Sequence, residues 1–170
     1  MVIMDTDMKT AQFRKLEKGF TLIELLVVIG ILAVLLAITL IAINPARQFS
    51  QANNTKRSSD VNAILNAVGQ YAADNKGALP AGIPSSDPNA ANNGAVVIGN
   101  GTGEANICAS LVTQYMAALP VDPLTNNGTP VTNCTGNYTT NYLIVKSATD
   151  NRITVTAPAA ELGQTIEVTR

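Results

Sequence analysis

The hydrophobic and polar positions of this chain form three successive patterns, and the first is a continuous apolar run. From Phe20 to Ile43 nearly every residue is apolar, and the exceptions are Thr21, Glu24, Gly30 and Thr39. A helix of this length spans roughly 36 Å, enough to cross the hydrocarbon core of a membrane. Its apolar residues surround the helix axis, so no face is left for water. On length alone, this run could be a plain membrane anchor or an uncleaved signal segment.

The second pattern is that of an amphipathic helix. Proline lacks a backbone donor and disfavours helix at the residue before it, so we expect a kink or break at Asn44-Pro45. Residues 46–74 then carry a single apolar stripe, made of Val61, Ile64, Leu65, Val68, Tyr71 and Ala72. The polar stretch 53–60 fits a solvent-facing helix or a subunit contact, and spacing does not decide between them. The helix should end near 75–77, with Gly77 as its cap.

The third pattern is alternation, which is typical of strands. Residues 138–146, 152–156 and 165–169 alternate with period two and are rich in β-branched residues. Their connections are short, which predicts an antiparallel meander of three strands. Before them we expect a long loop over 78–105 with a short strand at 95–98, then a short helix within 106–118. The predicted fold is therefore α+β, with a long N-terminal helix packed on a small antiparallel C-terminal sheet.

These patterns divide the chain into four parts. We expect a leader at 1–19, an apolar helix at 20–44, an amphipathic helix at 45–75 that forms the spine of a head, and the remaining α+β head at 76–170. The leader is short, polar and basic, without the apolar core of an ordinary secretory signal. Its positive charges favour a cytoplasmic N-terminus for a single-pass membrane protein.

Composition excludes several kinds of chemistry. The chain has 170 residues, a net charge of −1, and neither histidine nor tryptophan. Without histidine a Ser/His/Asp triad cannot form, and no Walker loop or zinc-protease motif occurs, so we expect no enzyme and no cofactor. No cluster of Lys and Arg marks a nucleic-acid site. Asp122, Asp150 and Glu161 would bind calcium if they lay together, but no spacing places them so, and we assign no metal.

Glu24 makes the apolar run more than a plain anchor. A carboxylate inside an apolar helix costs about 2.5–3.5 kcal/mol on insertion scales, so it needs a partner. Gly19 precedes Phe20 and follows a basic segment. Cleavage between Gly19 and Phe20 would create an α-amino group four residues from Glu24. The amine and the carboxylate could then pair within one chain or between neighbouring chains.

At these residues the chain resembles type IV pilins and pseudopilins. The motif is Lys-Gly-Phe-Thr-Leu-Ile-Glu at residues 18–24, followed by the apolar run. A Leu-Pro-x-Asp-Pro element at 119–123 is similar to one found in many members. The resemblance implies cleavage between Gly19 and Phe20 by a prepilin peptidase, N-methylation of Phe20, and assembly through Phe20, Leu22, Glu24, Leu25 and Leu26. Further partners implied are a pilus assembly ATPase, a platform membrane protein and other copies of the chain in a helical filament.

Export of the head bears on its two cysteines and on its location. An oxidising compartment favours a disulfide between Cys108 and Cys134. The subunit is expected in the cytoplasmic membrane before assembly, and afterwards in an extracellular pilus or a pseudopilus of the cell envelope. A structural pilin is the first hypothesis. The alternatives are a pseudopilin of a type II secretion system and a minor pilin whose head binds DNA or a surface.

Overall fold

The computed structural model describes residues 19–170, so all but the last residue of the expected leader lies outside the described part of the chain. The chain divides into two compact units that meet between Ile43 and Asn44. The first unit contains helix α1 (Leu22–Ile43). The second, the head, begins with helix α2 (Pro45–Asp74) and continues to the C-terminal residue.

Helix α2 begins and ends with local devices that the sequence predicts. Asn44 separates the two helices and lies in the left-handed region, with φ of 46°. Its side-chain carbonyl accepts a hydrogen bond from the Arg47 amide, and Pro45 takes the first helical position, where its missing donor costs nothing. At the other end Gly77, with φ of 87°, donates its amide to the Ala72 carbonyl. The predicted break and the predicted stop are both confirmed.

The sheet of the head has four antiparallel strands in the order β1-β2-β3-β4. They are β1 (Val96–Gly99), β2 (Thr139–Lys146), β3 (Ile153–Thr156) and β4 (Glu167–Thr169). The predicted meander of three strands is present as β2, β3 and β4. The short strand expected at 95–98 is present as β1, and its pairing with β2, which the sequence did not predict, extends the sheet to four strands.

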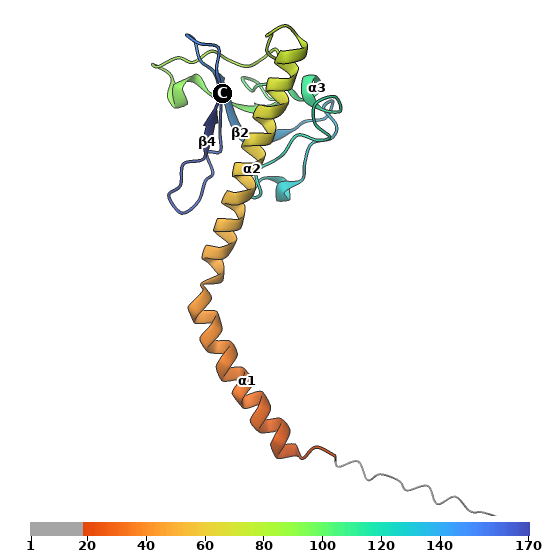
Figure 1. The fold of residues 1–170 in the computed structure, drawn as a ribbon, viewed down its shortest axis with the longest axis vertical. Coiled ribbons are helices and arrows are strands. Elements are labelled where there is room, and N and C mark those ends of the chain that lie inside the picture. Colours follow the sequence, from red (N-terminus) through yellow and green to blue (C-terminus); the bar gives the residue numbers. More distant parts are fainter. Residues whose placement is uncertain (1–18) are drawn as a thin grey trace, which may run out of the picture. The chain divides into compact units, whose positions relative to one another are not determined.

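The head core lies between α2 and the sheet, where α2 contacts β3, β4 and the short helix α3 (Cys108–Leu111) (Figure 1). The apolar stripe of α2 supplies Val61, Ile64, Leu65 and Val68, all buried. Strand β2 supplies Tyr142 and Ile144, which are completely buried. The α+β fold predicted from the sequence is confirmed.

The helix expected within 106–118 is much shorter than its apolar spacing indicates. Only Cys108–Leu111 is helical, because Val112 is extended and Thr113 has φ of 75°. The Thr113 amide donates instead to the Met116 carbonyl, which closes a small loop. Two short turns, Ala91–Gly94 and Asn126–Gly128, complete the elements of the head, and both contain asparagines in the left-handed region.

Candidate functional site: the N-terminal helix and its polar cap

Helix α1 presents an apolar surface with no partner inside the described chain. None of its residues is buried, and Leu26 has 58% of its surface exposed. Leu22 and Leu25, two further predicted assembly residues, are also exposed. Among the described residues α1 is the one helix long and apolar enough to cross a membrane. Removing this area from water is worth about 25 cal/mol per Å², so the helix requires lipid or other helices around it.

The first turn of α1 holds the carboxylate of Glu24 in a capping box. The Thr21 amide donates to Glu24 Oε2 over 2.8 Å, and the Thr21 hydroxyl donates to the same oxygen over 2.7 Å. In return, the Glu24 amide donates to Thr21 Oγ1 over 3.3 Å. Two backbone donors that the helix itself cannot satisfy are thereby paired. Sequence reasoning missed this contact, although Thr-x-x-Glu before an apolar run is its signature.

The predicted cleavage point lies just before this cap. Gly19 and Phe20 precede the helix in non-helical conformation, and Phe20 is among the most exposed apolar side chains of residues 19–170. A Cβ placed on Gly19 would meet nothing within 4 Å. Among the described residues nothing covers Gly19, and a cut between Gly19 and Phe20 would leave the new amine one residue before Thr21.

The head contains a buried cation, the guanidinium of Arg57. Arg57 on α2 has no exposed surface. Its guanidinium donates from Nε to Asp122 Oδ2 over 2.6 Å and from Nη2 to Asp122 Oδ1 over 3.3 Å. Nη1 donates to Glu161 Oε2 over 2.8 Å and to Asn54 Oδ1 over 3.0 Å. The pairing with Asp122, first among several causes, raises the pKa of Arg57.

Glu161 fastens the loop between β3 and β4 to α2. Besides Arg57, its carboxylate accepts from Ser50 Oγ and Asn53 Nδ2, each over 2.9 Å. The hydrogen bond from Arg57 is the largest of the effects that lower the pKa of Glu161 to about 2. The backbone of Glu161 is held as well, since its amide donates to Asn54 Oδ1 and its carbonyl accepts from Asn54 Nδ2.

Asp60, next on the same face of α2, ties the helix to the sheet. The Tyr142 hydroxyl of β2 donates to Asp60 Oδ2 over 2.8 Å, and Lys56 Nζ donates to the same atom over 2.9 Å. Burial raises the pKa of Tyr142, so its hydroxyl stays a donor. One face of the polar stretch 53–60, formed by Asn54, Arg57 and Asp60, thus points into the head, which neither of the two sequence interpretations anticipated. The opposite face, with Thr55, Lys56, Ser58 and Ser59, is exposed to solvent.

The carboxylates considered for calcium do not form a site. Asp122 and Glu161 both contact Arg57, while Asp150 lies in an exposed turn, where its carboxylate accepts from the Arg152 amide. Within residues 19–170 no group of three or more Cys, Asp or Glu side chains is placed to hold a metal ion. The guanidinium of Arg57 lies between Asp122 and Glu161, where a metal ion would have to bind.

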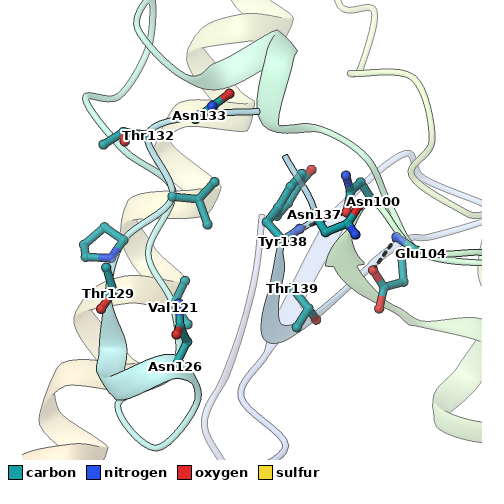
Figure 2. Close-up of a pocket in the computed structure, with 13 residues that line it drawn as sticks. Asn100, Glu104, Val121, Asn126, Thr129, Thr132, Asn133, Asn137, Tyr138 and Thr139 are labelled. Carbon is teal, nitrogen blue, oxygen red and sulfur yellow. Dashed lines mark hydrogen bonds between the residues drawn. The ribbon is translucent and has the colours of Figure 1, made fainter. Parts of the chain in front are cut away.

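The head also contains a disulfide with a cleft beside it. Cys108 and Cys134 are joined, with their Cα atoms 5.5 Å apart, as the sequence predicts for an exported domain. Beside them lies an open cleft of about 720 Å³ (Figure 2). Its lining combines amide and hydroxyl groups, including those of Asn100, Asn137 and Thr139, with apolar surface and the ring of Tyr138. Glu104 is the one charged lining residue, and no lysine or arginine is among them.

Comparison with known protein families finds a match at the N-terminal region of the chain. Residues 14–40 match the family model of the prokaryotic N-terminal methylation motif, the prepilin-type signal of type IV pilins and pseudopilins. The match spans the Gly19–Phe20 peptide and most of α1. No curated protein and no solved structure matches the chain. The motif supports a type IV pilin or pseudopilin in general, a structural protein anchored in a membrane by its apolar helix.

Proposed function

We propose that this chain is the structural subunit, a pilin, of a type IV pilus-like filament. Prepilin peptidase cleaves it between Gly19 and Phe20 and methylates the new amine. The mature subunit waits in the cytoplasmic membrane until an assembly ATPase and a platform membrane protein add it to the filament. The observation that carries the proposal is the exposed apolar surface of α1, interrupted at its first turn by one carboxylate.

The carboxylate supplies register that apolar packing lacks. One leucine-rich stretch resembles the next, so packed helices can slide at little cost, whereas a buried unpaired carboxylate costs several kcal/mol. Thr21 occupies Oε2 of Glu24, and Oε1 accepts no hydrogen bond from a described residue. The Phe20 amine of a neighbouring subunit can bind that second oxygen while the capping box stays intact. Leu22, Leu25 and Leu26 then pack helix against helix.

Substitution of Glu24 tests this assembly step. Glu24→Val should insert into the membrane and be cleaved normally, yet form few fibres, because the register contact is gone. Val27→Ile is the matched control, since it changes one methylene on the same exposed surface and should assemble normally. The measurements are mature protein in the membrane and subunit released by shearing. A normal fibre yield from Glu24→Val would leave apolar packing as the whole mechanism.

Substitution of Gly19 tests processing separately. Gly19→Arg places a long charged side chain at the cleavage point and should leave the uncut precursor in the membrane. N-terminal sequencing of the wild-type filament should begin at methylated Phe20. Assembled material that begins upstream of Phe20 would contradict this step.

Two other roles use the same subunit chemistry. A pseudopilin would need the same α1, and loss of secreted proteins in a deletion strain, without loss of surface fibres, would identify it. A minor pilin with a binding head is favoured by one observation, the cleft beside the disulfide, whose one charged lining residue is Glu104. Its amides, hydroxyls and tyrosine suit an uncharged polar surface ligand. DNA fits this cleft poorly, because none of its lining residues is cationic.

A further inference from the structure

Two large apolar side chains of the head are exposed where the chain leaves α1. Phe49 has 71% of its surface exposed and Leu162 has 48%. Outside α1 and Phe20, the described residues include one other exposed large hydrophobic, Leu124. Leu162 lies beside the first turns of α2, where it lines a shallow hollow with Ala46 and Arg47. We call Arg47, Phe49 and Leu162 the collar.

The chain itself limits how far the collar can lie from a membrane that contains α1. Phe49 follows the last residue of α1, Ile43, by two helical turns at most, which is about 9 Å along a helix. The headgroup region adds about 5–7 Å on each side of the hydrocarbon core. Any bend at Asn44 shortens the distance between Phe49 and the bilayer, so the straight arrangement sets the upper limit. Leu162 shares this position, because it lines one hollow with Ala46 and Arg47 of the first turn of α2.

The fastening of Glu161 determines which side chain of its loop faces outward. The Glu161 carboxylate points to α2, where Ser50, Asn53 and Arg57 donate to it. Its charge is thus paired inside the head, and the next residue, Leu162, is left exposed. From residue 44 to residue 55 the one ionisable side chain is Arg47, which is exposed. The collar therefore combines two apolar groups with one cation and no unpaired acid.

We propose that the collar binds the lipid surface of the membrane in the unassembled subunit. Phe49 and Leu162 enter the headgroup region of the leaflet on the side of the head, and Arg47 contacts lipid phosphate. This combination of apolar and cationic side chains is what binds a bilayer interface. Two separate points of attachment hold the head at a constant height and restrict its rotation about the Asn44 junction. The inference rests on membrane anchoring by α1 and is independent of whether a filament forms.

Single-tryptophan variants test the collar directly, because the natural chain has no tryptophan. Phe49→Trp and Leu162→Trp are purified in full length and placed in nanodiscs of phosphatidylethanolamine and phosphatidylglycerol, with and without brominated acyl chains. Bromine should quench both tryptophans by about twofold, as expected for side chains at the interface. Gln70→Trp is the matched control. It lies on the same helix, exposed, about 31 Å farther along, and should not be quenched.

A second pair of variants separates the collar from a general loss of structure. Glu161→Gln added to Leu162→Trp should reduce quenching at 162, because the loop loses its charged fastening. The same change added to Phe49→Trp should leave quenching at 49 unchanged. Quenching of 49 and 162 no greater than that of 70 would overturn the proposal. A blue shift that depends on protein concentration, without quenching by brominated lipid, would also overturn it and assign the collar to a second copy of the chain.

Discussion

The two long helices of this protein place their side chains in opposite environments. Helix α1 is almost wholly apolar, yet none of its residues is buried in the chain. Helix α2 is much more polar, yet it buries Asn54, Arg57 and Asp60 together with its apolar stripe. An apolar helix without an internal partner must be covered by lipid or other subunits, while a polar helix with satisfied internal partners completes a fold. The comparison separates the proposed assembly surface on α1 from the folding core of the head.

Arg57 should be the most sensitive position of the head. Arg57→Ala leaves Asp122 buried without its cation and removes the main partner of Glu161. Breaking a buried pair in this way costs about 3–5 kcal/mol of unfolding free energy. Urea unfolding of the detergent-purified chain, followed by near-ultraviolet circular dichroism, measures it. Arg152→Ala, in an exposed turn, is the control and should change little. Equal effects of the two variants would show that the network contributes nothing special.

A matched pair of leucines compares the two helices directly. Leu65 on α2 is 4% exposed, and its replacement by alanine should cost about 2–5 kcal/mol of unfolding free energy. Leu26→Ala on α1 makes the same chemical change on an exposed helix and should leave unfolding of the head within about 0.5 kcal/mol of wild type. Filament yield should respond to Leu26 instead. A large effect of Leu26→Ala on head unfolding would mean that α1 packs on its own head.

The disulfide should stabilise the head and leave α1 unaffected. Cys108 and Cys134 close a loop with a sequence separation of 26. The Cys108→Ser, Cys134→Ser double variant should lose about 3 kcal/mol in the chain-entropy model. Unfolding with and without reductant provides the same comparison in the wild-type chain. Alkylation before reduction should label neither cysteine, and labelling of both in the folded, exported protein would contradict the bond.

Acid should lower the stability of the head through protonation of Glu161. This is the smallest effect among the four predictions made for the head. The folded-state pKa of this carboxyl is about 2, against an ordinary value of 4.5. Because the pKa is depressed on folding, its contribution is complete above about pH 4.5 and is lost as the pH falls toward 2. The melting temperature of the head should fall through that window. Glu161→Gln should flatten this part of the profile, and an unchanged slope would assign the acid sensitivity to other groups.

Much of the fold follows from local patterns. The apolar run, the proline at 45 and the glycine at 77 predict both helices and their ends, because each signal acts within a few residues. Period-two alternation predicts β2, β3 and β4 in the same way. The helix expected within 106–118 was too long. Its apolar residues are spaced as in a helix, but they are buried by tertiary contacts and do not continue the helix beyond Leu111. Of those residues, Ile107 and Val112 are buried although they lie outside the helical turn Cys108–Leu111.

The N-terminal part of the candidate site also follows from local patterns, whereas the polar network of the head does not. The motif at 18–24 and the apolar run after it can be read from sequence, because both are continuous local patterns along the chain. The inward position of Arg57 could have been suspected, since steps of three and four residues continue the apolar stripe from Val61 back to Arg57 and Asn54. The stripe does not reveal what a buried guanidinium would pair with. Neither interpretation of 53–60 considered the inside of the head.

The sequence by itself determined where this chain is apolar, where its helices stop, and where a prepilin-type signal occurs. Only the tertiary structure decided what the polar residues of α2 do. Arg57 meets Asp122 and Glu161, which lie 65 and 104 residues away along the chain. A polar residue at a helical spacing looks the same whether it faces water or a buried carboxylate. The difference arises when loops distant in sequence close over it, because charge pairing depends on distance in space and leaves no periodic trace along the chain.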